Sequence, residues 1–207
     1  VYSFDELFAE KKCGETIFAM HSSTIRTERL HAVGMKVQEH CFYADTDLMF
    51  YIGLAARMVT FFDSCAYQYR LGSEGQSVSP AGMYNHIEDL MKIEGNLIHL
   101  FAERSPKIES PARKAYLFSI IDTRYSMIFW CYTFIIQRSE KDKLFVQFLG
   151  DVNQKYPALI NQMHLSRIDH YVAGNPAKRV PAIRKVRKTW WFKALQQLKH
   201  LVASGNR

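Results

Sequence analysis

Cysteine is scarce in this sequence and poorly spaced for metal binding. The four cysteines stand at positions 13, 41, 65 and 131, with no Cys-x-x-Cys pair, so the spacing of a zinc site is missing. Ten glycines and six prolines among 207 residues argue against a collagen-like or linker chain. A chain of this length buries about 70% of its unfolded surface without disulfides. We therefore expect one folded domain, or one with an appendage, with free thiols in a reducing compartment.

Long apolar runs are also missing. The most apolar stretch, residues 115–137, is interrupted by Asp122 and Arg124, and its uncharged remainder is about half as long as a transmembrane helix. We predict a buried helix here. The chain begins Val-Tyr-Ser-Phe-Asp, without an initiator Met or an apolar leader, which predicts cropping or processing from a longer protein.

Acidic residues are absent from the last 32 residues of the chain. The whole sequence carries 27 Lys and Arg against 20 Asp and Glu, but nine of the basic residues and none of the acidic ones lie in 176–207. The other 175 residues are near neutral, with 18 basic and 20 acidic side chains. The positive charge therefore belongs to a tail, which favours a surface-binding segment over a nucleic-acid-binding globule.

Residue patterns predict a fold that runs from α/β to mostly α. Strand-like composition and helical spacing alternate in the first half, and helical spacing dominates the second. The expected strands are 15–20, 58–62 and 66–70, and the expected helices are 27–33 ending at Gly34, one opened by Asp45, 87–101, 115–137, 143–156 and 161–172. We divide the chain into an α/β part (1–103), a helical segment (104–175) and a basic amphipathic tail (176–207).

Three segments carry a resemblance to a known family. They are His21 to Leu30 with Arg26-Thr27-Glu28-Arg29-Leu30, then Phe42 to Leu48 with Tyr43-Ala44-Asp45-Thr46, then Tyr67 to Ser79 with Tyr69-Arg70, Gly72 and Ser77-Val78-Ser79. In this order they resemble the second, acceptor-side half of glycosyltransferase family 2, the inverting GT-A enzymes that build bacterial capsule, cell-wall and exopolysaccharide chains. The resemblance covers about residues 15–103, and Ala44 stands where the family usually has Glu.

The resemblance implies a catalytic base. In inverting transfer an acceptor hydroxyl loses its proton as it attacks the anomeric carbon, and a carboxylate within hydrogen-bond reach can accept that proton. Asp45 stands where the family has its base. From the residues alone, the favoured role of Asp45 is the N-cap of the helix that follows, where its oxygen would accept from free backbone N–H groups.

The leaving nucleoside diphosphate needs cations or hydrogen-bond donors around it. Arg70, with Gln76 and Ser77 in the same loop, resembles the family's diphosphate-contacting loop, and a guanidinium binds phosphate oxygens in pairs. The alternative is a surface turn with a solvated Arg70. Arg26 fits either phosphate binding or an ion pair on a helix surface, and His21 fits a structural role or a metal ligand.

The nucleotide-binding half of the family is not recognisable in this sequence. Family members hold a divalent metal, Mg or Mn, on an Asp-x-Asp motif in that half. Asp45-Thr46-Asp47 matches the Asp-x-Asp pattern but stands where the family has its catalytic base, so we assign no metal ligand in the chain. The resemblance implies that the nucleotide-sugar donor and its metal bind mainly outside this chain, which alone should be inactive.

The tail has the pattern of an amphipathic helix. Its apolar positions include Ile183, Val186, Trp190 and Leu198, and basic residues occupy much of the remaining surface. Such a helix, with its paired tryptophans, fits the headgroup layer of an anionic membrane, where each basic residue contributes about 1 kcal/mol. The alternatives are a helix packed on the body with a solvated basic face and, least favoured, RNA binding; we assign no nucleic-acid partner.

Two hypotheses follow from these patterns. The first is the acceptor-side part of a bacterial glycosyltransferase that uses a nucleotide-sugar donor and a glycan or lipid-linked acceptor, peripheral on the cytoplasmic face of the cell membrane. The second is a non-catalytic helical module that docks on a membrane or a partner through residues 176–207. In the second hypothesis Asp45 and Arg70 only stabilise the fold.

Overall fold

A computed structural model describes residues 1–9, 18–64, 67–68, 70 and 79–189. These residues are mostly helical. The α-helices are α1 (Phe4–Ala9), α2 (Thr27–Ala32), α3 (Ala44–Ala55), α4 (Pro80–Asn85), α5 (Ile87–Arg104), α6 (Pro111–Trp130), α7 (Asp142–Lys155), α8 (Pro157–Ile160), α9 (Arg167–Gly174) and α10 (Pro176–Arg187). The mostly α expectation is confirmed, while the GT-A-like arrangement of residues 1–103 stays a prediction.

The remaining elements are short. Strands β1 (Tyr2–Ser3) and β2 (Met58–Val59) pair antiparallel, with Tyr2 opposite Val59. Two 3₁₀ turns, η1 (Met20–Ser22) and η2 (Ser105–Lys107), and one π-helical turn, η3 (Cys131–Ile135), complete the described part of the chain. β2 therefore realises the first two residues of the predicted strand 58–62.

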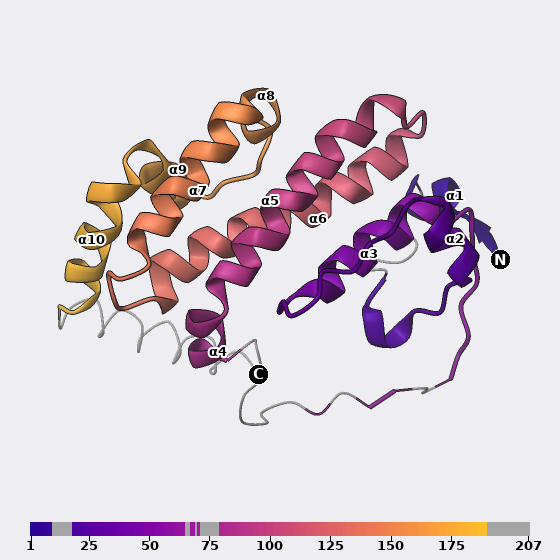
Figure 1. The fold of residues 1–207 in the computed structure, drawn as a ribbon, viewed down its shortest axis with the longest axis horizontal. Helices are drawn as coiled ribbons and strands as arrows, with labels where there is room; N and C mark the ends of the chain where they lie inside the picture. The colour runs from indigo at the N-terminus through magenta and orange to yellow at the C-terminus, as the bar shows by residue number, and fades with distance from the viewer. Residues whose placement is uncertain (10–17, 65–66, 69, 71–78, 190–207) are drawn as a thin grey trace, which may run out of the picture.

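Helices α5 and α6 form a long hairpin at the centre of the molecule (Figure 1). α1 and α3 pack against α6 on one side, and α7, α9 and α10 pack together on the other (Figure 1). The predicted helix 87–101 is confirmed as α5, and its apolar face is buried: Ile87, Leu90, Met91, Ile93, Leu97, Ile98 and Phe101. The hairpin therefore supplies the core against which both halves of the chain pack.

Helix α6 realises the apolar stretch predicted as a buried helix. Its N-cap Ser110 accepts a hydrogen bond from the backbone N–H of Arg113 at 3.1 Å, and Pro111 occupies the first helical position, where a missing N–H costs nothing. α6 ends at Trp130 and passes into η3. Among the described residues, none of the helices has the length and apolar character needed to span a membrane.

Helix α2 ends as the sequence predicts. Gly34 adopts the left-handed conformation (φ 71°), which glycine reaches without steric cost. The N–H groups of Gly34 and Met35 donate to the carbonyls of His31 and Leu30, at 2.9 and 3.0 Å. This pair of bonds is a Schellman motif, and it satisfies the last carbonyls of α2.

The C-terminus of α3 is held by an arginine from α6. The Arg113 guanidinium donates to the carbonyls of Gly53, Leu54 and Ala56, the last at 2.7 Å, and these groups have no partner within the helix. Beside it, the buried Tyr116 ring packs so closely on Gly53 that a Cβ there would lie 2.7 Å from its Cδ1. α3 is therefore fixed to α6 by one charged and one steric contact.

Helix α10 packs on the body through residues that the sequence pattern placed on its solvated side. Arg184 is 6% exposed and forms a two-point ion pair with Asp142, while its Nε donates to the carbonyl of Ile136 at 3.1 Å. Arg187 donates to the carbonyl of Thr133 at 2.8 Å. Cations suit these carbonyls because a helix C-terminus carries partial negative charge.

Three local predictions are wrong. Tyr67, Gln68 and Arg70 do not form a strand; they are irregular and exposed. The helix predicted at 161–172 begins only at Arg167, because Ser166 and Asp169 form a capping box there. In the described part of the predicted strand 15–20, Phe18 is buried but is followed by the 3₁₀ turn η1.

Candidate functional site

A cleft of about 420 Å³ lies between α2 and the beginning of α3. We call it the Asp45 cleft. Its walls come from both helices and from the segments beside them: Thr27, Leu30, His31, Ala44, Asp45, Leu48, Met20, Met35 and Val37. Two of the three segments that carry the family resemblance, 26–30 and 43–46, therefore meet in one cleft.

Asp45 lies at the second position of α3, where its charge is favourable near the positive end of the helix dipole. It is half-buried and lines the cleft. The prediction that Asp45 is the N-cap is wrong, because Tyr43 occupies that position in a left-handed conformation (φ 65°). Asp45 forms no hydrogen bond or ion pair with any described residue. A carboxylate placed in this way can accept a proton from a hydroxyl that enters the cleft.

Asp47 belongs to the core and not to the cleft. It is 4% exposed, and none of the described residues donates a hydrogen bond to its Oδ2. Burial, and after it the charge of Asp45, raises the pKa of the Asp47 carboxyl from 3.8 to about 6. The neighbouring Thr46 is fully buried as well. The turn thus directs one carboxyl into the cleft and one into the protein.

This divergence does not fit a metal site on Asp45-Thr46-Asp47. A divalent metal needs oxygen ligands that converge on one point, whereas Asp45 lines the cleft and Asp47 is buried. Within the described ranges, no group of three or more His, Cys, Asp or Glu side chains is arranged to hold a metal ion.

The structure locates the remaining predicted site residues only in part. Arg70 is exposed, and Gln76 and Ser77 lie outside the described residues. The His21 ring lies against the Tyr67 ring, with centroids 5.2 Å apart. The end of the predicted strand 15–20 is thus brought beside the start of the third resemblance segment.

Sequence reasoning missed two polar residues of the Asp45 cleft. Thr27 and His31 are four residues apart in α2, so they share one face of that helix, and both line the cleft. The helical spacing of 27–33 contains this signal. Arg26 lies elsewhere, in a second cleft described below.

Comparison of the chain with protein-family models, with curated proteins and with solved structures finds no match.

Proposed function

We propose that this chain is the acceptor-side part of an inverting glycosyltransferase that transfers a sugar from a nucleotide-sugar donor to a glycan or lipid-linked acceptor in bacterial surface polysaccharide synthesis. One observation carries most of the support: the segments 26–30 and 43–46 form the walls of a single cleft, and Asp45 lines it. A proton acceptor in a cleft of this size is what the acceptor side of such a reaction requires.

Asp45 acts as the general base in this proposal. The acceptor hydroxyl gives its proton to the Asp45 carboxylate while its oxygen forms a bond to the anomeric carbon of the donor. The bond from that carbon to the nucleoside diphosphate breaks on the opposite face, and its electron pair leaves with the diphosphate. Attack and departure on opposite faces invert the configuration of the anomeric carbon.

Arg70, Gln76 and Ser77 are proposed to contact the leaving diphosphate. The exposure of Arg70 is compatible with this role, because a guanidinium at the surface can reach phosphate oxygens. A divalent metal, Mg or Mn, would neutralise diphosphate charge in the complete enzyme. Because Asp45 and Asp47 do not converge, we expect its ligands mainly outside this chain.

The test compares two neighbouring carboxyls in the full-length protein. The assay measures nucleoside diphosphate release from a panel of nucleotide-sugars, with a bacterial lipid and glycan extract as acceptor. Asp45→Asn should lower turnover by about 100-fold or more, the usual contribution of a general base, with nucleotide binding unchanged. Asp47→Asn is the matched control, because it removes an equal charge from the same turn and should retain turnover.

Three outcomes would contradict the proposal. Turnover of Asp45→Asn at the wild-type rate would exclude Asp45 as the base. No turnover by the wild-type protein with any donor in the panel would favour the non-catalytic module. Equal losses in Asp45→Asn and Asp47→Asn would mean that the charge of the turn, and not proton transfer, is what matters.

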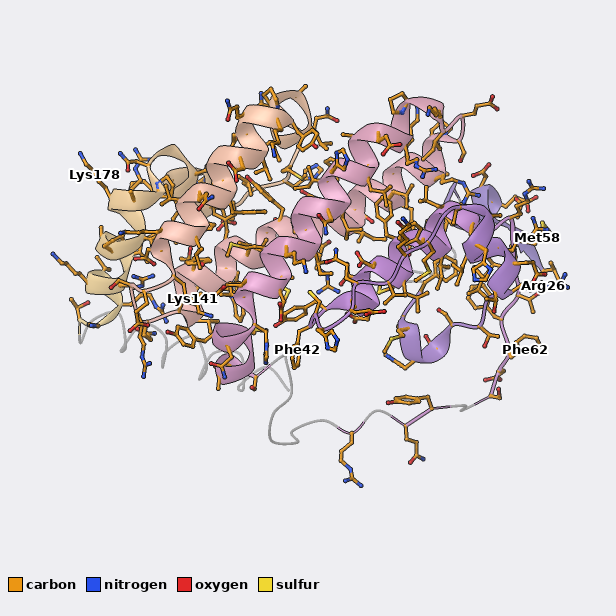
Figure 2. All side chains as sticks on the ribbon, viewed as in Figure 1. Arg26, Phe42, Met58, Phe62, Lys141 and Lys178 are labelled. Carbon is orange, nitrogen blue, oxygen red and sulfur yellow. The ribbon has the colours of Figure 1, made fainter. Side chains whose placement is uncertain are left out.

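The same protein is proposed to bind the anionic inner face of the cell membrane through residues 176–207. Lys178 and Lys185 of α10 and Lys188, directly after it, are exposed, and Val186 is 41% exposed. Lys178 lies at the outer edge of the molecule (Figure 2). Arg184 and Arg187 are already engaged with the body, so membrane contact would fall to the lysines and to 190–207, which lie outside the described residues.

Vesicle sedimentation tests this contact. The protein should sediment with phosphatidylglycerol vesicles and not with phosphatidylcholine vesicles. Replacing the three lysines by Gln, or deleting residues 190–207, should weaken binding about tenfold or more, since each basic residue contributes about 1 kcal/mol. Deletion from residue 176 is the wrong test, because it also removes Arg184. Sedimentation unaffected by either change would contradict the proposal.

A further inference from the structure

A second cleft, of about 440 Å³, lies beside the C-terminal end of α3 and holds an unusual concentration of positive charge. Three arginines line it: Arg26 before α2, Arg29 within α2 and Arg57 before β2. We call it the arginine cleft. Figure 2 shows Arg26 beside Met58, at the edge of the molecule opposite α7–α10.

The three arginines are exposed, and none of them is paired with an acidic side chain among the described residues. None of the described side chains that line the cleft is Asp or Glu, and none of the three arginines forms an ion pair with a described residue. Like charges gathered in one cleft repel each other, and a bound anion removes that repulsion. The arrangement therefore favours an anionic ligand.

The other lining residues narrow the chemistry of that ligand. Hydroxyl groups of Ser23, Thr24 and Thr60 line the cleft and add hydrogen-bond donors to those of the guanidinium groups. Arginine matches phosphate oxygens in pairs. Three guanidinium groups can together contact the oxygens of two linked phosphates, so the cleft suits a diphosphate.

The floor of the cleft is apolar. Phe18 and Ile52 line it and are 7% and 3% exposed. An apolar floor limits water behind the bound group, and charge-assisted hydrogen bonds are stronger where water is limited. The volume also falls in the range of small-molecule sites.

From these observations we infer that the arginine cleft binds a diphosphate-bearing ligand through Arg26, Arg29 and Arg57. Diphosphate binding is inferred from the cleft and its charges alone; only the distinction between this ligand and the reacting donor rests on the proposed role of Asp45.

The ligand of this cleft is not the reacting donor. Asp45 lies at the start of α3, and Ala55, which lines the arginine cleft, ends the same helix. Ten residues of α-helix span about 15 Å. In the proposed reaction a donor's diphosphate is bonded to the carbon that reacts beside Asp45, so a diphosphate held at Arg57, beyond the far end of α3, cannot belong to that donor. In Figure 2, Phe42 lies near the beginning of α3, and Arg26 and Met58 lie toward its other end.

Isothermal titration with inorganic pyrophosphate at low ionic strength tests the inference. The wild-type chain should bind it saturably, and the triple variant R26Q/R29Q/R57Q should bind at least about tenfold more weakly, since charge-assisted bonds to phosphate are the strong ones. Arg167→Gln is the matched control, because Arg167 is also exposed and lies in α9, away from the cleft. It should leave the affinity unchanged.

A second pair of variants keeps the test decisive if the triple variant folds poorly. Arg57→Lys retains the charge and loses the planar fork, whereas Arg57→Gln loses both. The affinity for pyrophosphate should be highest in the wild type, lower in Arg57→Lys and lowest in Arg57→Gln. Absence of saturable pyrophosphate binding, or equal affinities for wild type and the arginine variants, would overturn the inference.

The diphosphate can come from a soluble molecule or from a lipid headgroup. Phosphatidylcholine vesicles with and without a polyprenyl diphosphate distinguish these sources, because the wild type and the triple variant share the same tail. If the protein binds the vesicles only when they contain the polyprenyl diphosphate, and only when the three arginines are present, then the ligand of the arginine cleft is a lipid headgroup. If the protein binds pyrophosphate but does not bind these vesicles, the ligand is a soluble diphosphate.

Discussion

Asn in place of Asp47 is expected to stabilise the protein at neutral pH. Asp47 is 4% exposed, and its Oδ2 lacks a hydrogen-bond donor among the described residues. Burial, followed by the charge of Asp45, raises the pKa of this carboxyl from 3.8 to about 6. Asn has nearly the same shape as Asp and no charge at any pH, so the substitution removes the buried charge and retains the packing.

The sign and size follow from the linkage of protonation to folding. The unfolded chain releases the Asp47 proton near pH 3.8, whereas the folded protein holds it to about pH 6. Between these values unfolding releases a proton, so each rise of one pH unit lowers the free energy of unfolding by about 1.4 kcal/mol. Between pH 3.8 and about pH 6 the free energy of unfolding of the wild type therefore falls by at most about 3 kcal/mol, and that of Asp47→Asn does not fall for this reason.

Urea unfolding of both proteins from about pH 4 to about pH 8 measures this difference. The two free energies of unfolding should nearly coincide at the acid end, diverge in favour of Asp47→Asn, and differ by a constant amount above about pH 7. The buried Glu94, whose pKa burial also raises, titrates in both proteins, so its contribution cancels. Asp151→Asn, an exposed carboxyl of α7, is the control and should show no such divergence.

A difference that stays flat across this pH range would refute the reasoning, because Asp47 would then ionise as readily in the folded protein as in the unfolded chain. Asp45→Asn supplies an independent check. The charge of Asp45 raises the pKa of Asp47, so removing it should lower that pKa, as measured by the carboxyl ¹³C shift of Asp47.

Two further changes test how α3 and α10 are anchored, with urea unfolding as the measurement. Gly53→Ala should destabilise the protein by about 1–3 kcal/mol, because its Cβ would lie 2.7 Å from Cδ1 of a buried tyrosine ring. Gly150→Ala has no atom within 4 Å of its added Cβ and should stabilise by about 0.5–1 kcal/mol; effects of the same sign would contradict the steric account. Arg184→Ala should cost about 3 kcal/mol or more by leaving Asp142 unpaired. Lys185→Ala, on the exposed side, should stay within about 0.5 kcal/mol of wild type, and a similar cost for both would contradict the assigned roles.

The sequence predicts those helices and helix ends that depend on interactions between residues close together in the chain. The apolar positions of 87–101 follow helical spacing, and α5 buries them. Gly34 ends α2 because the left-handed conformation there favours glycine. The Ser-x-x-Asp spacing of the capping box at Ser166 and Asp169 is also visible in the sequence, and it starts α9 six residues later than the apolar spacing of 161–172 predicts.

Burial of charged side chains was harder to predict, because it depends on neighbours that are distant in sequence. Glu94 follows the same spacing as Ile87, Met91 and Ile98, so the pattern places it on the buried face, yet a carboxyl is rarely buried unpaired. Arg184 is buried because Asp142 and the carbonyl of Ile136 lie opposite it. Neither partner can be identified from the helical pattern of the tail.

The Asp45 cleft shows the same limit. Asp45 was selected from its place in a motif, and its position at the start of a helix was predictable. Thr27 and His31 join it only because α2 packs against α3, and the chain between these helices gives no signal of that contact. The pairing of the cleft walls is therefore a property of the tertiary fold.

Helix α3 contributes residues to both clefts, so a change that displaces this helix should affect both of them. Asp45 lies at its first turn, while Ala55 and Arg57 lie at its end. Arg113 donates hydrogen bonds to the carbonyls at the C-terminus of α3, and the Tyr116 ring packs against Gly53, so this end of α3 is fixed to α6. A change at this anchor should disturb pyrophosphate binding and Asp45-dependent turnover together. Arg57→Gln and Asp45→Asn should affect the two activities separately, because the ends of α3 lie about 15 Å apart and salt screens the interaction of exposed charges over that distance.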